Sequence, residues 1–189
     1  MLGKPRFTII TPTLQRESLV RCCESVDKQT FRSWEHVVMA DVEQLDQELV
    51  SRVRHSGRLI AKCKSPHQNF GNTCRHNAWT FANGQYLLYL DDDNYLADDR
   101  ILEDMMNLIV TPWALFPILR HGGKFFTDPP RTCHVDTANV VVSREIGRWP
   151  NIPDYTADGQ FVESLLKYPY QAFPDFRPIV VMEKSNEGK

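Results

Sequence analysis

The chain has 189 residues, a length that suits one compact domain and leaves little room for two independent hydrophobic cores. Apolar residues make up 42% of it and charged residues 24%, the usage of an ordinary globular protein, which excludes a disordered chain, a collagen-like fibre and a coiled-coil rod. With 22 basic against 24 acidic residues the formal charge is −2, which disfavours nucleic acid as a partner.

No apolar run is long enough to cross a membrane, because the longest is about seven residues and a spanning helix needs roughly 20. The N-terminus lacks the apolar run of an export signal, so we expect a cytoplasmic protein and leave a peripheral membrane contact open. Five cysteines, an odd number, favour reduced thiols. A zinc site of Cys63, His67, Cys74 and His76 is the weaker alternative, since its spacing matches no usual paired motif.

The first part of the chain alternates strand-like and helix-like segments. Residues 7–11 predict a strand that ends at Pro12, and residues 34–40 predict a second, buried strand. Between them, apolar residues at helical spacing over 19–26 predict a helix with Glu17 in its first turn.

The alternation continues through the middle of the chain. The polar stretch 41–57 is ambiguous, although Leu45, Leu49 and Val53 fit one helical face, and a short strand is expected at 58–61. A helix over 72–82 is expected to stop at Gly84, before an apolar strand at 86–90.

The remaining segments predict a helix at 99–109, capped by Asp98 or Asp99, and a strand at 113–119. After residue 120 the pattern becomes irregular, and the elements expected there are a strand at 138–142, a helix at 159–167 and a strand at 177–182. Strands that alternate with helices predict an α/β fold whose mostly parallel sheet is covered on both faces.

Three consecutive acids follow the apolar strand at 86–90. Because residues i and i+2 of an extended chain point the same way, Asp91 and Asp93 are expected to converge. Oxygen pairs of this kind bind hard divalent cations, and Mg²⁺ uses one or two carboxylates together with substrate phosphates. The alternative is a solvated acidic turn that caps the next helix.

Taken together, these segments resemble glycosyltransferase family 2. The resemblance covers roughly residues 5–120 well and the remainder weakly. The segments that carry it are, in order, residues 8–13, 34–41, 71–75 and 82–86, the last of which leads into 90–93. It implies the GT-A fold, with a Rossmann-like, mostly parallel central sheet flanked by helices. It also implies a single domain over 1–189, with a nucleotide-sugar-binding part at 5–120, a short acceptor part at 121–183 and a disordered tail at 184–189.

The resemblance also assigns residues to the donor side. It implies that a nucleoside diphosphate sugar contacts Thr11, Pro12, Thr13, Arg16, Asp41, Arg75, Asp91 and Asp92. Asp91 and Asp93 match the D-x-D element, which implies Mn²⁺ or Mg²⁺ as the cofactor. Ala40, His76 and Ala78 depart from the family pattern, so the base and the sugar stay open. The alternative for Arg75 and His76 is that they are polar residues on the exposed face of a helix and bind no ligand.

Transfer with inversion needs a separate base on the acceptor side. Asp158 occupies the place of the family's late acidic motif and is the candidate, with helix capping as the alternative reading. Asp154 and Asp136 are its rivals, and His134 either approaches the metal or is structural. Stacking on a sugar face is the alternative to core packing for three aromatic residues, Trp113, Trp149 and Tyr155.

The resemblance therefore implies an inverting, metal-dependent glycosyltransferase that moves a sugar from a nucleoside diphosphate sugar, with UDP favoured, to an acceptor hydroxyl. Saccharide, lipid-linked and protein acceptors are all open. The alternatives are a non-catalytic or partner-dependent nucleotide-sugar-binding module and, less favoured, a sugar-phosphate nucleotidyltransferase. The short acceptor region adds the hypothesis of a homo-oligomer in which a second chain completes the site.

Overall fold

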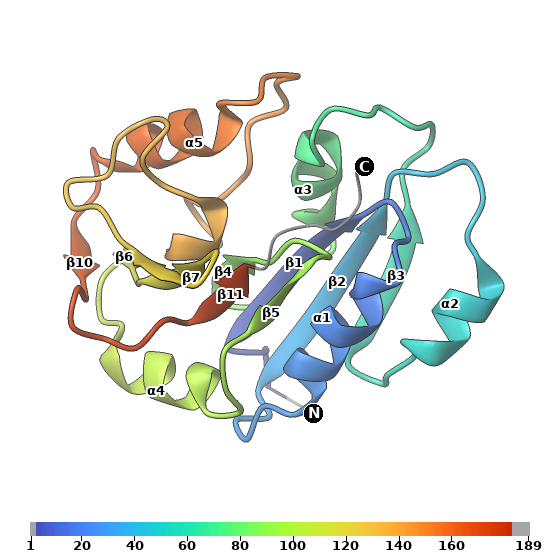
Figure 1. The fold of residues 1–189 in the computed structure, drawn as a ribbon, viewed down its shortest axis with the longest axis horizontal. Helices are drawn as coiled ribbons and strands as arrows, with labels where there is room; N and C mark the ends of the chain where they lie inside the picture. Colours follow the sequence, from blue (N-terminus) through green and yellow to red (C-terminus); the bar gives the residue numbers. More distant parts are fainter. Residues whose placement is uncertain (1–2, 183–189) are drawn as a thin grey trace.

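The computed structural model describes residues 3–182, which form two sheets and five α-helices (Figure 1). The larger sheet has seven strands in the order β10-β6-β9-β4-β1-β2-β3, and the smaller has four in the order β5-β11-β7-β8. The tail expected at 184–189 lies outside the described residues. The strands are β1 Phe7–Thr13, β2 Trp34–Ala40, β3 Arg58–Lys62, β4 Tyr86–Tyr89, β5 Asn94–Leu96, β6 Trp113–Leu115, β7 Ile118–Arg120, β8 Gly123–Phe125, β9 Val140–Ser143, β10 Tyr170–Ala172 and β11 Val180–Met182. The helices are α1 Ser18–Asp27, α2 Gln47–Arg52, α3 Asn72–Ala78, α4 Ile101–Leu108 and α5 Ala157–Leu165, with a short 3-10 turn at Thr137–Asn139.

The larger sheet is mostly parallel, as the alternation of elements predicts. Strand β1 pairs in parallel with β2 and β4, and β2 pairs in parallel with β3. Strand β9 is the exception, because it lies antiparallel between β4 and β6. A strand from the last third of the chain therefore sits near the middle of the sheet, joined by backbone hydrogen bonds to the part that precedes residue 120.

Helices cover both faces of the larger sheet, and the side chains of β4 alternate between them. Leu88 packs in one buried cluster with Val26 of α1 and Met105 of α4. Leu87 packs in another with Ala78 of α3 and residues of α5. Burial of a side chain of this size stabilises the fold by roughly 1.5–3 kcal/mol relative to exposure. The stretch 41–57 proves helical in part, because α2 buries Leu49 against α1.

Two strands differ from the sequence prediction at a proline. Pro12 does not end β1, which runs on to Thr13. Leu90 N–H donates to Ile10 O, so the polar backbone atoms of Ile10 face β4. The backbone of Pro12, two residues further along β1, faces the same side, but β4 ends before this position. The missing N–H of Pro12 therefore removes no hydrogen bond between the two strands. The strand expected at 113–119 is instead two strands in different sheets, β6 and β7, with Phe116 and Pro117 between them.

Helix ends account for the other differences. Helix α3 stops at Ala78, and Gly84 is not its stop. A Cβ at Gly84 would lie 2.5 Å from the backbone N of Thr8, so glycine is required there by the close approach of β1. Arg100, and not Asp98 or Asp99, is the N-cap residue of α4, and Arg100 N–H donates to Asp98 Oδ1 at 2.8 Å. Glu17 is the N-cap residue of α1 and does not lie in its first turn. No helix within residues 3–182 is long and apolar enough to cross a bilayer.

Candidate active site

A cavity of about 400 Å³ opens at the carboxyl ends of β1, β2 and β4. These strands are parallel, so the residues that follow them meet at one edge of the sheet, where open α/β sheets bind ligands. Its volume is in the range of small-molecule sites. The lining residues are Pro12, Thr13, Leu14, Arg16, Asp41, Gln68, Phe70, Gly71, Arg75, Asp91, Asp92 and Asp93. Every donor-side residue predicted from the sequence is among them except Thr11.

Thr11 lies behind the cavity, fully buried in β1. Its Oγ1 lies 2.9 Å from His36 Nε2, while Arg58 Nε donates to His36 Nδ1 at 3.0 Å. Since arginine can only donate, Nδ1 accepts, and the imidazole proton sits on Nε2 and is donated to Thr11. Burial lowers the pKa of His36 well below its usual value, so the ring is neutral. Thr11 therefore supports the wall of the site from within the core.

The three acids after β4 lie on a turn rather than an extended strand, because Asn94 N–H donates to Asp91 O at 3.0 Å. The extended backbone assumed for Asp91 and Asp93 is therefore wrong. Asp91 is instead bound by Arg75, and Asp93 Oδ2 lies 3.5 Å from Arg16. Both acids nevertheless line the same cavity from different directions.

Asp92, between them, is buried and accepts a hydrogen bond from Thr13 Oγ1 at 2.6 Å and one from Leu14 N–H at 3.3 Å. Burial raises the pKa of Asp92 to about 6, against the lowering effect of the Thr13 hydrogen bond and of Arg16. This carboxylate ties the end of β1 to the turn after β4. The solvated acidic turn considered as an alternative does not describe it.

Arg75 is a buried cation at the cavity wall, only 5% exposed, so exposed helix polarity does not describe it either. It binds Asp91, donates to Phe70 O at 2.7 Å and lies 5.1 Å from the centre of the Trp149 ring. Its Nε is buried and has no hydrogen-bond partner among the described residues. A buried guanidinium with an unused donor suits an anionic ligand.

The loop between β3 and α3 closes one side of the cavity. Asp41 holds it, because its two carboxylate oxygens accept from the N–H groups of His67 and Gln68, both at 2.8 Å. Gln68 and Phe70 have φ values of 50° and 59°, left-handed conformations that are uncommon outside glycine. Such strain persists only where surrounding contacts fix it, and it is frequent at ligand sites. Sequence reasoning missed these two lining residues, although a phenylalanine in an otherwise polar stretch was a signal.

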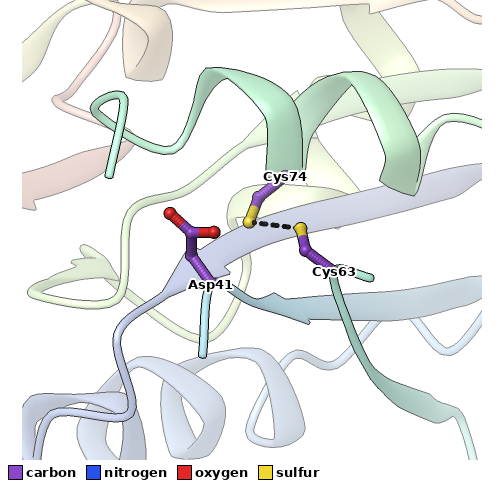
Figure 2. Close-up of side chains that lie close together, drawn as sticks. All are labelled: Asp41, Cys63 and Cys74. Atoms are coloured by element: carbon purple, nitrogen blue, oxygen red, sulfur yellow. Dashed lines mark hydrogen bonds between the residues drawn. The ribbon is translucent and has the colours of Figure 1, made fainter. Parts of the chain in front are cut away.

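Asp41 also lies against two thiols that the fold brings together. Figure 2 shows Cys63, just after β3, and Cys74, in α3, pointing toward each other, with their Sγ atoms 3.2 Å apart. The ligand atoms of Asp41 and of both cysteines lie within 4.8 Å of one another. His76 is not part of this group, since its Nδ1 lies 2.7 Å from Trp149 O, so the zinc quartet considered as the weaker alternative is not assembled. All five cysteines are free thiols, in agreement with the sequence prediction.

Asp158, the base expected from the sequence, lies in the first turn of α5, where Thr156 and not Asp158 is the N-cap residue. Its Oδ1 accepts from Gly159 N–H at 2.7 Å. Burial raises the pKa of Asp158, and Asp91 adds to this rise while Arg75 opposes it. Asp158 is therefore within electrostatic reach of the donor-side residues.

Its two rivals have different surroundings. Burial raises the pKa of Asp136 to about 6, and the charges of Asp91 and Asp158 add to the rise. Asp154 is exposed and accepts from Thr156 N–H at 2.8 Å and Thr156 Oγ1 at 3.0 Å, hydrogen bonds that lower its pKa. Three carboxylates, Asp91, Asp136 and Asp158, thus repel one another around the site.

The aromatic residues considered for sugar stacking, and His134, differ in how far they are buried. Trp113 and Trp149 are buried and pack in the core, so neither presents a face to a ligand. Tyr155, by contrast, is 75% exposed and lies edge-on to Phe70. His134 is exposed.

The donor set fits a divalent cation. Asp91 and Asp93 both line the cavity, and two carboxylates are what Mg²⁺ takes from a protein when substrate phosphates complete its shell. Burial raises the pKa of Asp136 most, and the charges of Asp91 and Asp158 add to the rise, a repulsion that a bound cation would relieve. Within residues 3–182, Asp91 and Asp93 do not belong to a ready cluster of three ligands, so phosphate oxygens would have to supply the rest.

Comparison with known families decides where the chain belongs. The model of Glycosyl transferase family 2 matches residues 8–173, which is most of the chain. The chain belongs to glycosyl transferase family 2. This match extends the resemblance beyond residue 120, into the part that the sequence motifs covered weakly. A comparison with curated proteins finds no match.

Solved structures support the fold of this family 2 chain. S. aureus TarS 1–349 superimposes with a TM-score of 0.78 at 16% identity, over 94% of this chain and 60% of that one. The same protein in complex with UDP-GlcNAc gives 0.78 at 19% identity, over 97% and 60%. The mannosyltransferase PcManGT from Pyrobaculum calidifontis, in complex with GDP-Man and Mn²⁺, gives 0.74 at 17% identity, over 99% and 59%. The predicted GT-A fold is confirmed, and the chain spans about three-fifths of the length of these solved chains and 37% of a longer TarS chain.

Proposed function

We propose that this chain is an inverting, divalent-metal-dependent glycosyltransferase that moves a sugar from a nucleoside diphosphate sugar to an acceptor hydroxyl. One observation carries the proposal: residues from four separate motifs, which follow β1, β2 and β4 and begin α3, line a single cavity. The carboxylate of Asp158 is coupled electrostatically to that cavity from a fifth segment. Nothing in a merely structural domain requires this concentration of charge.

The donor binds through its diphosphate. Arg75 and Arg16 bring positive charge to the cavity wall, and the unused Nε–H of Arg75 is a further donor for an anionic oxygen. UDP is the favoured nucleoside diphosphate, since TarS is solved with UDP and with UDP-GlcNAc. GDP is the alternative, because PcManGT is solved with GDP-Man.

Asp91 and Asp93 would hold the cation, either Mn²⁺ or Mg²⁺. When bound, it stabilises the negative charge that grows on the departing diphosphate. The two arginines that now pair with these acids supply further positive charge on the same side of the cavity.

Asp158 is the proposed base, which takes the proton of the acceptor hydroxyl as its oxygen attacks the sugar. Its raised pKa makes it a stronger base than an ordinary aspartate, whereas the hydrogen bonds of Asp154 lower the pKa of that rival. Asp136 is the second candidate, because its pKa is raised to about 6, but it caps the 3-10 turn through Ala138 N–H at 3.0 Å. Asp158 also accepts a backbone hydrogen bond, from Gly159 N–H, but Asp136 is the N-cap residue of its turn and accepts from Thr137 Oγ1 at 3.4 Å as well. Asp136 is therefore the more fully engaged of the two carboxylates.

Two other functions stay as alternatives. The first is a non-catalytic or partner-dependent nucleotide-sugar-binding module, which would bind the nucleotide in the same cavity without turnover. A sugar-phosphate nucleotidyltransferase is less favoured, because residues 11–16 after the first strand contain no glycine-rich loop. Saccharide, lipid-linked and protein acceptors are compatible with either form of the transferase.

Thermal unfolding with UDP, GDP and their sugar derivatives, with and without Mn²⁺, tests the proposal. We expect one nucleotide to raise Tm, and to raise it further with Mn²⁺. Asp93→Ala should keep the ligand-free Tm and lose the Mn²⁺-dependent increment together with sugar transfer. Asp175→Ala, which changes an exposed acid outside the cavity, is the matched control. Full turnover by Asp93→Ala in the presence of a chelator contradicts the metal assignment, and binding without turnover by the unaltered chain favours the module.

A further inference from the structure

Two large aromatic side chains stay exposed at the rim of the cavity. Phe70 is 61% and Tyr155 75% exposed, and their ring centres lie 5.3 Å apart with an angle of 76° between the rings. The edge-to-face arrangement leaves ring surface open to solvent. Exposed apolar surface that gathers beside a ligand site is typically kept for binding.

The pair joins the two sides of the candidate site. Phe70 lines the donor cavity next to Gly71, whereas Tyr155 does not line it and precedes α5, which carries Asp158. A ligand that touches both rings therefore lies between the nucleotide-sugar residues and the proposed base. This is where the acceptor of the proposed reaction has to lie.

The position of Tyr155 is fixed by hydrogen bonds rather than by the aromatic contact alone. Asn72 Nδ2, at the start of α3, donates to Ile152 O and to Asp154 O, both at 3.0 Å. Figure 1 shows the segment before α5 rising beside the loop that leads into α3. Phe70 is anchored as well, because Arg75 donates to Phe70 O at 2.7 Å. The backbone that carries each ring is thus held before a ligand binds, which lowers the cost of ordering it on binding.

The surroundings of the platform select the ligand. Asp154 directly precedes Tyr155 and accepts a hydrogen bond from Gln160 Nε2 at 3.1 Å, so the segment that carries the exposed ring also carries carboxylate and amide groups that can bind hydroxyls. Planar rings cover the C–H face of a pyranose while such polar groups bind its hydroxyls. A lipid-linked acceptor is disfavoured, because Asp154 and Asp158 would repel its phosphate.

We propose that Phe70 and Tyr155 form the acceptor platform, which binds the pyranose ring of a saccharide acceptor against its aromatic surface. This inference rests on the proposed function and narrows it to a saccharide acceptor. The ring of Tyr155 is the part that matters, and its hydroxyl is dispensable.

Saturation-transfer NMR tests the platform with methyl β-D-glucopyranoside, methyl β-D-galactopyranoside and methyl α-D-mannopyranoside as probes, in the presence of UDP and Mn²⁺. We expect the ring C–H protons of at least one glycoside to receive saturation from the protein. Tyr155→Ala and Phe70→Ala should raise the Kd of that glycoside by roughly 3- to 10-fold, the usual contribution of an aromatic contact. Tyr155→Phe should restore binding, and Phe81→Ala, which removes an exposed ring elsewhere, is the control.

The outcomes separate the two proposals. UDP binding without any glycoside signal, or equal glycoside binding in Tyr155→Ala, overturns the platform and leaves the proposed function standing. Failure of the unaltered chain to bind any nucleoside diphosphate overturns the proposed function and the platform with it. A rise in the Kd of UDP in Tyr155→Ala, with the glycoside unaffected, assigns the ring to the nucleotide and also overturns the platform.

Discussion

The carboxylates of the site have different surroundings, which suit them to different roles. Asp91 is neutralised by the buried cation Arg75, while Asp92 is buried with a raised pKa and holds β1 to the turn after β4. Asp158 is only partly buried and accepts a hydrogen bond from the N–H of its neighbour Gly159. Identical side chains thus differ in basicity and availability because their solvation differs.

Asp158→Asn is expected to remove the proposed base while keeping the shape of the side chain. The rate of sugar transfer should fall by about 10²- to 10⁴-fold, the usual contribution of a general base. The Kd of UDP should stay unchanged, because Asp158 does not line the donor cavity. Steady-state kinetics with the best sugar nucleotide, together with UDP titration, measure both quantities.

Asp154→Asn is the comparison for this prediction. Asp154 is exposed and its hydrogen bonds lower its pKa, so its replacement should reduce transfer much less. A larger loss in Asp154→Asn than in Asp158→Asn would move the base to Asp154. Full activity in both would leave Asp136 as the candidate.

At the level of elements, the loop from β3 to α3 is shaped by unusual backbone conformations. Gly71, just before α3, has φ of 75°, and a Cβ there would lie 2.8 Å from Pro12 Cβ. The loop can therefore approach β1 closely only with glycine at this place. The same approach brings Phe70 to the rim of the cavity.

Gly71→Ala should lower the free energy of unfolding by more than the roughly 1–2 kcal/mol of a left-handed alanine, because the contact with Pro12 adds to the strain. Gly122→Ala is the matched control, since Gly122 has φ of 85° and no atom within 4 Å of its Cβ position. Urea unfolding of the two variants measures the difference. Equal losses would mean that the loop shifts freely away from Pro12.

Across the whole molecule, a buried polar chain links one helix and three strands to the site. Asp27 of α1 pairs with Arg58 of β3 at 2.6 Å, and Arg58 donates to His36 of β2, which donates to Thr11 of β1. His36 has no room for a second proton, because Arg58 already points a donor at Nδ1. The fold therefore requires a neutral histidine at its centre.

This requirement predicts a loss of stability in acid. The pKa of His36 is lowered by folding, so the unfolded chain takes up a proton near pH 6.5 and the folded chain does not. Stability is fully present above that pH and falls, by about 1.4 kcal/mol per pH unit, as the pH drops toward the folded pKa. Urea unfolding between pH 7.5 and 5 measures the slope.

His36→Gln keeps a donor for Thr11 and removes the titration. The variant should be less stable than the unaltered chain at pH 7.5, and the difference between them should shrink as the pH falls. Asp92 and Asp136 have the opposite effect on the pH dependence of stability, because folding raises their pKa values to about 6. Both residues are present in the variant and in the unaltered chain, so their effects cancel in the comparison. A difference that does not change with pH contradicts the assignment.

Local patterns in the sequence predicted much of this architecture, and particular residues show why. The apolar run that ends in Asp91, the helical spacing of Leu19, Cys22 and Val26, and the strand at 34–40 all appear in the structure, because burial of one face imposes a period on neighbouring residues. The donor-side residues were expected from the resemblance to family 2, and all of them except Thr11 line one cavity.

Tertiary structure alone decided which distant segments meet. It placed β9 between β4 and β6, divided 113–119 between two sheets, and brought Tyr155 against Phe70. The order of residues already determined that a charged cavity would form at the ends of the first strands, because those signals are local. The far wall and the rim of this cavity depend on contacts between segments that are remote in the chain. The spacing of neighbouring residues carries no information about the free energy of such contacts.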